Sequence, residues 1–306
     1  VRSDDVTQIR RRKNLGQLIE SVKKVASGVT NGNWVFDDYA RGSATFRPIR
    51  VDEYAPEHLW KHGGKWLLMS ATLISPDEMA ESLGWEKDFA VVRVPSTFPI
   101  ENRPVIVAPV ANMTAKSKET EWPKMAAALM NVADLHPDER ILVHTVSYQL
   151  MEFLASAMRD GGFAKRVLTY RSAQDREGAL SKFRRTEAGI LIAPSMDRGV
   201  DLPMDACRVI VVCKAPFPYL GDKQVAARLH TRGGNSWYAV QTVRSLVQMT
   251  GRAMRSVDDR CTSYILDAQF TSNVWAKNRS LIPKWFSEAL VWDFQKSKLT
   301  RPRSHQ

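Results

Sequence analysis

The chain has 306 residues, of which 44% are hydrophobic and 25% charged, as is ordinary for a globular protein of about two domains. No run of about 18 apolar residues occurs, so no membrane span is expected, and the N-terminal residues given lack the apolar core of a signal peptide. The net charge of +11, from 44 Lys and Arg against 33 Asp and Glu, favours a polyanionic partner, nucleic acid above all, over a merely basic enzyme.

The first ninety residues are predicted to form a basic helix followed by short extended pieces. Apolar residues recur at helical spacing over residues 6–27, with arginines and lysines between them. Extended pieces are expected at residues 34–36 and 45–51, and the apolar run at residues 66–69 predicts a buried strand. A Ser-Pro-Asp-Glu stretch then predicts a helix with Ser75 as its N-cap and proline at its first position.

From residue 105 onward, strand and helix patterns alternate. Short apolar runs predict strands at residues 105–110, 141–144, 167–170, 190–193, 209–213 and 263–266. Helical patterns lie between them at residues 119–135, 148–159, 174–184 and 241–254. This alternation predicts an α/β fold, a parallel sheet with helices on both faces. Residues 95–104 contain three prolines and are the expected linker between two lobes.

The predicted helix at residues 241–254 carries a polar stripe. Gln248, Arg252 and Arg255 fall at positions i, i+4 and i+7, so a continuous helix would present all three to one target. Arginine forks suit phosphate oxygens because a planar guanidinium donates two parallel hydrogen bonds. Gly251 has no side chain and permits a close approach of a ligand or another backbone. Alone, the pattern is equally that of a basic surface helix beside a turn.

Three further polar clusters follow predicted strands. In parallel α/β lobes, ligands bind beyond the carboxyl ends of the strands, so these clusters are candidate binding residues. They are Ser70 and Thr72; Thr145, Ser147 and Tyr148; and Arg198, Gly199 and Asp201. Taken singly, each cluster is more simply explained as an ordinary strand-to-helix loop. The order of the clusters along the chain therefore decides between a loop and a binding site.

That order resembles motifs III to VI of superfamily 2 helicases of the XPD/DinG-like branch. The matching stretches are S-A-T at residues 70–72, L-V-H-T-V-S-Y at 142–148, R-G-V-D-L-P at 198–203 and Q-M-T-G-R-A-M-R at 248–255. Weaker matches are the interlobe segment at residues 95–103, A-P-F-P at 215–218 and L-D-A-Q-F at 266–270, where Gln269 stands in the usual Arg position. The resemblance covers residues 45–290.

The resemblance implies the C-terminal part of an enzyme with two RecA-like lobes and ATP between them. Residues 1–40 are then the helical tail of an arch-like insertion, 41–95 the end of the first lobe with motif III, and 96–306 the second RecA-like, P-loop NTPase-type lobe with motifs IV, V and VI. Neither a Walker A nor a Walker B motif occurs, since Gly64-Lys65 is followed by Trp66 instead of a hydroxyl residue. ATP and Mg²⁺ would be held mainly by the missing first lobe.

The resemblance also assigns roles residue by residue. Most relatives carry Glu where Arg198 stands, so a phosphate contact and a structural salt bridge both stay open for this position. The implied catalytic residues are Arg252, Arg255 and Gln248; the implied nucleotide-binding residues are Gly199, Asp201, Gly251, Ser70 and Thr72; the implied nucleic-acid-binding residues are Thr145, Ser147, Tyr148 and Arg198.

The expected function is therefore that of the C-terminal part of an ATP-dependent DNA helicase, which translocates on single-stranded DNA and unwinds duplexes, 5′ to 3′ if it follows the branch. Its expected partners are single-stranded or forked DNA and the missing N-terminal lobe, in cis or in trans. We expect the chain to be inactive alone. The alternative is a nucleic-acid-binding or regulatory helicase-like protein without ATPase activity. An unrelated α/β enzyme is disfavoured because no H-E-x-x-H or G-x-S-x-G motif occurs.

The cysteines bear on redox state and metals. Cys207, Cys213 and Cys261 are an odd number without a C-x-x-C pair, so we expect no disulfide framework and a reducing compartment. The expected localisation is the cytoplasm of a bacterial or phage-infected cell. No metal site is expected, and the ligands of an iron–sulfur cluster, if the parent protein has one, would lie upstream. Because the chain does not begin with Met, a fragment, a processed product and an alternative start all stay open.

Overall fold

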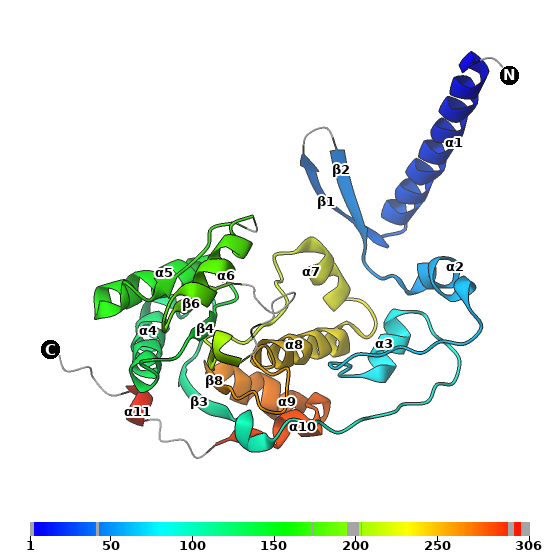
Figure 1. The fold of residues 1–306 in the computed structure, drawn as a ribbon. Helices are drawn as coiled ribbons and strands as arrows, with labels where there is room; N and C mark the ends of the chain where they lie inside the picture. Colours follow the sequence, from blue (N-terminus) through cyan, green and yellow to red (C-terminus); the bar gives the residue numbers. More distant parts are fainter. Residues whose placement is uncertain are drawn as a thin grey trace. The chain divides into compact units, whose positions relative to one another are not determined.

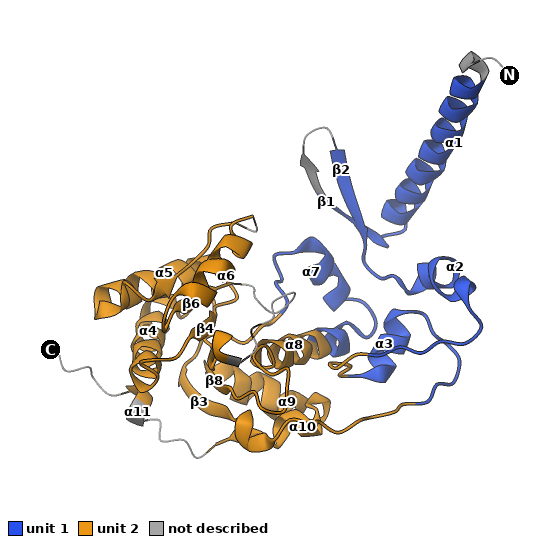
Figure 2. Cartoon of the chain, in the orientation of Figure 1, with its two compact units in different colours: residues 1–69, 75–90, 218–238 blue, residues 70–74, 91–217, 239–306 orange. Residues whose placement is uncertain are grey.

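The computed structural model describes residues 3–40, 43–172, 174–194, 202, 204–292 and 297–300. The chain divides into two compact units, each assembled from separate stretches of sequence (Figure 2). Unit 1 contains Val1–Met69, Ser75–Ala90 and Pro218–Tyr238, and unit 2 contains Ser70–Ile74, Val91–Phe217 and Ala239–Gln306. Two short segments thus belong to a different unit from the residues that flank them in sequence. Ser70–Ile74 belongs to unit 2, and Pro218–Tyr238 belongs to unit 1. The predicted boundaries at residues 40 and 95 stay predictions.

Unit 2 is built on a seven-stranded sheet with the order β5-β6-β4-β7-β8-β3-β9 (Figure 1). All of its pairings are parallel. The strands are β3 (Val105–Ala111), β4 (Ile141–His144), β5 (Val167–Leu168), β6 (Ile190–Ala193), β7 (Val209–Val212), β8 (Thr262–Asp267) and β9 (Leu290–Val291). The central strands β4, β6 and β7 are buried at every position, which explains their unbroken apolar sequences. The predicted α/β fold is confirmed.

Helices cover both faces of this sheet. Ile106 and Val107 are adjacent on β3 yet belong to different apolar clusters, because successive side chains of a strand point to opposite faces. The Ile106 cluster includes side chains of α4 (Lys118–Leu135) and α5 (Tyr148–Met158). On the opposite face, α6 (Arg176–Arg185) and α8 (Gly234–Thr250) supply the cover. The shorter helices are α9 (Ala276–Asn278), α10 (Lys284–Ser287) and α11 (Ser297–Thr300).

Unit 1 combines a long helix, a hairpin and three short helices. The antiparallel hairpin of β1 (Trp34–Ala40) and β2 (Ser43–Pro48) follows α1 (Ser3–Thr30). The short helices are α2 (Ala55–His58), α3 (Pro76–Ser82) and α7 (Lys223–Leu229). The predicted start of α3 is confirmed, because the Ser75 hydroxyl accepts a hydrogen bond from the Glu78 amide at 3.2 Å. None of the helices in the described ranges is long and apolar enough to cross a membrane.

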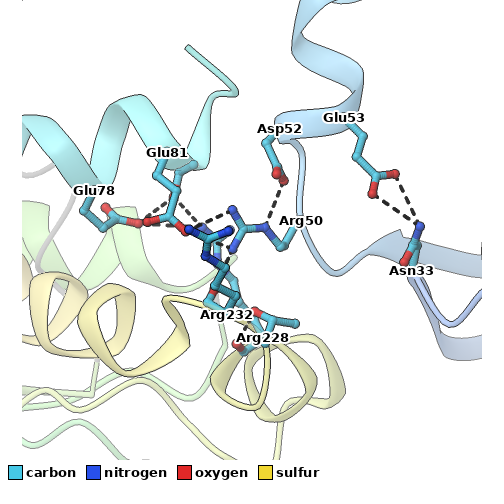
Figure 3. A network of polar contacts seen from close by, with 10 residues as sticks. Asn33, Arg50, Asp52, Glu53, Glu78, Glu81, Arg228 and Arg232 are labelled. Carbon is cyan, nitrogen blue, oxygen red and sulfur yellow. Dashed lines mark hydrogen bonds and ion pairs between the residues drawn. The ribbon is translucent and has the colours of Figure 1, made fainter. Parts of the chain in front are cut away.

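A network of charged side chains joins three distant segments of sequence within unit 1 (Figure 3). The Arg50 guanidinium donates to Asp52 at 3.0 Å, to Glu81 at 3.4 Å and to the backbone carbonyl of Arg232 at 2.7 Å. Partly buried pairs of this kind resist screening by salt better than exposed ones. The network therefore fastens Pro218–Tyr238 to the N-terminal part of the unit, although the two are far apart in sequence.

Arg228 on α7 strengthens the same junction. Its guanidinium lies 3.7 Å from the Glu78 carboxylate and stacks over the Trp237 ring at 4.6 Å. Burial lowers the pKa of Arg228, and the nearby Glu78 carboxylate opposes that shift. The guanidinium nevertheless stays charged, because its ordinary pKa is far above neutrality.

One predicted element is absent. Residues 66–69 form no strand, and the side chains of Leu67 and Met69 are 80% and 83% exposed, so the prediction of a buried strand here is wrong. A strand needs a neighbouring backbone to bond with. Within the described part of the chain, no backbone group pairs with Leu67, Leu68 or Met69.

Candidate functional site

In unit 2, one buried aspartate side chain links the loops that follow neighbouring strands at the C-terminal edge of the sheet. Asp267, the last residue of β8, is 1% exposed. Its Oδ1 accepts hydrogen bonds from the backbone amides of Met113 and Gln269, both at 3.0 Å, and its Oδ2 accepts one from Ala215 at 2.8 Å. Met113 and Ala215 follow β3 and β7 closely, so one side chain holds the exits of three adjacent strands.

Burial raises the pKa of Asp267, and the three amide donors oppose this rise because they favour the charged form. The position is a structural one, since the carboxylate oxygens are occupied by backbone amides. It fixes the loop that begins at Ala215 and leads out of unit 2 toward Pro218.

The helix that carries the predicted arginine stripe ends earlier than expected. The structure places the end of α8 at Thr250, not at residue 254, and its start at Gly234, not at residue 241. Thr250 is buried, and its hydroxyl lies within hydrogen-bond distance of the carbonyls of Leu246 and Val247, at 3.3 and 3.2 Å. Such a bond competes with continuation of the helix, and Gly251 is a poor helix former.

A second buried carboxylate shapes the turn that follows. Asp259 is 1% exposed and accepts hydrogen bonds from the backbone amides of Arg255 and Ser256, at 2.6 and 2.8 Å. These amides are therefore unavailable to a helix. The Arg255 guanidinium is exposed and donates to the carbonyls of Met254 and Gly251, at 2.8 and 3.3 Å. Arg255 is thus tied to the turn by both its backbone and its side chain.

The expected single stripe of Gln248, Arg252 and Arg255 is consequently wrong in its geometry. Gln248 lies in the last turn of α8, whereas Arg252 and Arg255 lie in the turn after it. The turn nevertheless places both arginines directly beyond the C-terminal end of α8. Gly251 belongs to the same turn, and an added Cβ there would lie 3.3 Å from the Val247 carbonyl oxygen.

The structure joins two of the predicted site residues directly. The Gln248 side-chain amide donates to the Thr72 hydroxyl at 2.9 Å, across 176 residues of sequence. The Thr72 amide in turn donates to the Ser70 hydroxyl at 3.1 Å. Ile74, two residues further on, is 6% exposed and packs in one apolar cluster with Val243 of α8. The segment Ser70–Ile74 is therefore seated on α8 within unit 2.

The cluster after β4 separates into structural and exposed members. Thr145 is fully buried, with its hydroxyl near the carbonyls of Ser147 and Ala193 at 3.0 and 3.3 Å. The Ser147 hydroxyl caps α5 by accepting from the Leu150 amide at 3.3 Å. Tyr148 has the accessible ring, 44% exposed. A role of the three residues in nucleic-acid binding stays a prediction.

Three predicted residues, Arg198, Gly199 and Asp201, lie outside the described residues. Among the residues that the structure does describe, no group of three or more His, Cys, Asp and Glu side chains could hold a metal ion. The three cysteines are free and buried, and burial raises the pKa of the Cys207 thiol to about 12.

Sequence reasoning missed Asp259 and Asp267. An Asp directly after an apolar strand is a weak signal for such a role, and Asp259 lies in a polar stretch without any distinguishing pattern. Their function depends on backbone amides of other elements, which a local pattern does not contain.

The Thr72–Gln248 contact predicts a measurable coupling. In a double-mutant cycle of Thr72→Val and Gln248→Met, we expect a coupling free energy of about 0.5–1.5 kcal/mol in urea unfolding, the range of a single net hydrogen bond. Thr72→Ser keeps the hydroxyl and should retain the coupling with Gln248. Strictly additive single variants would show that the contact contributes nothing.

Removal of the Asp267 carboxylate should destabilise unit 2. Asp267→Ala leaves three amides without their acceptor, and we expect a loss of at least about 2 kcal/mol in the free energy of unfolding. Asp258→Ala, at an exposed position in the same unit, should change it by less than about 0.5 kcal/mol.

The same comparison has a pH dependence. Because the pKa of Asp267 is raised in the folded state, its stabilising contribution is complete below about pH 4 and falls as the pH rises through the raised value. The difference in unfolding free energy between wild type and Asp267→Ala should therefore become smaller as the pH rises from about 4 through the raised pKa of Asp267. A difference that widens with pH would contradict the direction of the shift.

The chain is similar to known helicases over part of its length. Residues 129–289, more than half of the chain, match the helicase C-terminal domain family. The ATP-dependent DNA helicase XPD of Sulfolobus acidocaldarius is 22% identical over 166 residues, which cover 51% of this chain and 30% of that protein. The ATP-dependent helicase DinG of Mycobacterium tuberculosis is 30% identical over 99 residues, which cover 30% of this chain and 15% of that protein.

Solved structures agree on the fold. A structure of XPD in its apo form superposes with a TM-score of 0.60 at 18% identity, covering 90% of this chain and 59% of that one. A further XPD helicase structure gives a TM-score of 0.60 at 17% identity, covering 86% and 49%. The predicted RecA-like architecture is confirmed, and the match to the XPD and DinG relatives spans less than a third of their length. The chain belongs to the helicase C-terminal domain family and is similar to the XPD and DinG helicases.

Proposed function

We propose that this chain is the C-terminal part of an ATP-dependent DNA helicase and supplies the arginine half of its ATP site. The observation that carries the proposal is the turn after α8, in which Arg252 and Arg255 stand next to a Gln248 held by Thr72. These residues match the family's motifs VI and III, and all four lie in unit 2. The complete enzyme would couple ATP hydrolysis to translocation on single-stranded DNA and to duplex unwinding, 5′ to 3′ as in the branch it resembles.

The chemistry of the turn suits a polyphosphate. Guanidinium groups keep their charge at any physiological pH and donate in a planar fork that matches phosphate oxygens. In the proposed site, Arg252 and Arg255 stabilise the negative charge that develops during phosphoryl transfer, an effect of about 10³–10⁵ in rate in comparable enzymes. The Arg255 side chain would then donate to phosphate oxygens in place of the backbone carbonyls of Met254 and Gly251.

Gln248 has a separate part in the proposed site. Its Nε2 is engaged with Thr72, whereas its Oε1 is buried and accepts no hydrogen bond from any residue in the described ranges. A buried acceptor without a donor is costly, so the carbonyl oxygen is suited to receive a donor that arrives with the nucleotide, such as the attacking water. The side-chain amide of Gln248 would orient that water.

The other half of the site is assigned to the missing lobe. ATP would bind mainly to the Walker A loop, and Mg²⁺ to the acidic motif, of a first RecA-like lobe supplied in cis or in trans. Arg198, Gly199 and Asp201 match motif V and would contribute from this chain. For the strand of DNA, the exposed ring of Tyr148 is the candidate stacking surface, and the net charge of +11 favours the backbone phosphates.

Reconstitution tests the proposed ATP site. The isolated chain should hydrolyse no ATP, and addition of the first lobe should yield DNA-stimulated hydrolysis. In that pair, Arg252→Ala or Arg255→Ala should lower kcat by about 10³-fold or more, and Arg→Lys should restore little because the fork is lost. Lys277→Ala, at an exposed basic position of unit 2, serves as the matched control.

Two outcomes would contradict the proposal in different ways. DNA-stimulated hydrolysis by the isolated chain would show that it holds a complete ATP site of its own. An inert pair, with both lobes folded and associated, would remove the ATPase and leave the alternative of a nucleic-acid-binding protein without a motor.

Binding of single-stranded DNA is testable on the isolated chain. With a fluorescent oligothymidylate, the logarithm of the association constant should fall with the logarithm of salt concentration by about 0.7 per phosphate contacted. Tyr148→Ala should weaken binding by about 1–3 kcal/mol, whereas Tyr148→Phe keeps the ring and should bind as the wild type does. Binding independent of salt would remove the nucleic-acid assignment from both functions.

A further inference from the structure

One valine in the loop between β4 and α5 has a backbone conformation that valine rarely adopts (Figure 1). Val146 lies in the left-handed region, with φ at 62°. This region is unfavourable for residues with a Cβ, and most of all for β-branched ones, so glycine or asparagine usually occupies it. Among the described residues, Ala188 is the other non-glycine residue with positive φ, and it is not β-branched. The backbone at Val146 is therefore strained, and contacts around it have to hold it.

Those contacts come from the core of unit 2. The Val146 side chain packs against the apolar cluster that contains Val212 of β7 and Val243 of α8. The residue before it, Thr145, is fully buried, and its amide donates to the Ala193 carbonyl at the end of β6, at 3.0 Å. The side chain of the valine and the backbone before it are thus both fixed, which is the condition under which a strained conformation persists.

The two residues after Val146 show what this conformation achieves. Ser147 has an extended backbone, and its hydroxyl caps α5 by accepting a hydrogen bond from the Leu150 amide at 3.3 Å. Tyr148 is then the first residue of α5, and its ring is 44% exposed. The left-handed residue thus allows the chain to leave a buried strand and to present an aromatic ring to solvent within one short loop.

A buried neighbour supports the exposed ring. Tyr148 and Tyr170 pack edge to face, with ring centroids 6.2 Å apart and planes at 84°. Tyr170 is 5% exposed and follows β5 closely, so its ring is part of the core. The Tyr148 ring is therefore held by its backbone and by a neighbouring ring while nearly half of it stays open. A ring held in this way loses little side-chain entropy when a base stacks on it.

A role in the turn alone does not account for a valine at this position. Glycine would form the same turn without strain, because it adopts positive φ as readily as negative φ. Glycine would also lack the side chain that ties the turn to the apolar cluster, so the turn would be free to move. What valine supplies beyond glycine is a fixed direction for the residues that follow. Strained residues are concentrated at ligand-binding sites for this reason.

We infer that Val146 is a positioning residue for the nucleic-acid contact of Tyr148. Its apolar contact and its left-handed backbone fix the direction in which the ring is presented, so a base of single-stranded DNA stacks on it without having to order the loop first. The inference rests on the proposed function, which assigns the stacking contact to Tyr148. Val146 itself contributes no group to the nucleic acid.

Substitution by glycine separates positioning from stability. Val146→Gly relieves the strain and loses the apolar contact, so the unfolding temperature of the isolated chain should stay within about 3 °C of the wild-type value. Its affinity for a fluorescent oligothymidylate should nevertheless fall by about 3–10-fold, because binding then has to order the loop. Val146→Ile keeps the β-branch and the apolar contact and should bind as the wild type does. Val257→Gly, at a 52% exposed position of unit 2, is the matched control and should leave affinity unchanged.

A double-mutant cycle with the ring shows where the effect arises. Tyr148→Ala removes the stacking surface and weakens binding by itself. In that background, Val146→Gly should change the affinity by less than about 1.5-fold, because the ring that the valine positions is gone. An equal loss of affinity with and without the ring would show that the valine acts elsewhere, and this result would overturn the inference.

The remaining outcomes separate the inference from the proposed function. Normal binding by Val146→Gly, together with weak binding by Tyr148→Ala, overturns the inference and leaves the nucleic-acid contact. Normal binding by both variants overturns the stacking assignment and the inference, whereas the ATPase of the reconstituted pair is measured separately. An inert pair overturns the ATPase and leaves the binding cycle valid. An unfolding temperature of Val146→Gly lowered by more than about 10 °C would show a purely structural role and overturn the inference.

Discussion

The arrangement of unit 2 depends on one buried carboxylate. Asp267 accepts hydrogen bonds from three backbone amides, one in each of the loops that follow β3, β7 and β8. These bonds fix the first residues of the three loops. Burial of an ionised group is unfavourable by itself, and the three donors reduce that cost without cancelling it, since the pKa of Asp267 stays raised. The loop after β7 leads into Pro218–Tyr238, which unit 1 holds by ion pairs such as Arg228–Glu78 and Arg47–Asp222. The segment is therefore constrained at its origin and along its length.

The candidate site uses the same device a second time. Asp259 accepts hydrogen bonds from the amides of Arg255 and Ser256, which therefore cannot donate to helix carbonyls. The chain turns after Thr250 instead of continuing α8. Both buried aspartates accept hydrogen bonds from backbone amides, Asp267 with both of its carboxylate oxygens and Asp259 with Oδ2. Buried carboxylates thus position the backbone of the turn, whereas the Arg255 guanidinium at the same turn is exposed.

Local patterns predict the sheet well and the turn poorly. The strands β4 and β6 coincide with the predicted residues 141–144 and 190–193, because a fully buried parallel strand is a short apolar run with clear ends. The end of α8 was misplaced because Asp259, the residue that stops it, is nine residues beyond Thr250 and acts through space. The apolar run at residues 66–69 predicts a strand, but a strand forms only beside another strand. Within the described residues, no neighbouring backbone pairs with this run. Both errors concern partners that the local sequence does not contain.

Magnitudes decide what the Thr72–Gln248 bond does. Full burial of an Ile side chain is worth about 1.5–3 kcal/mol, whereas one net hydrogen bond contributes about 0.5–1.5 kcal/mol. Ile74 is 6% exposed among side chains of α8, so its burial, more than the hydroxyl of Thr72, keeps Ser70–Ile74 on the helix. The hydrogen bond is then available for orientation: it holds the side-chain amide of Gln248 in one rotamer and leaves Oε1 as the remaining acceptor.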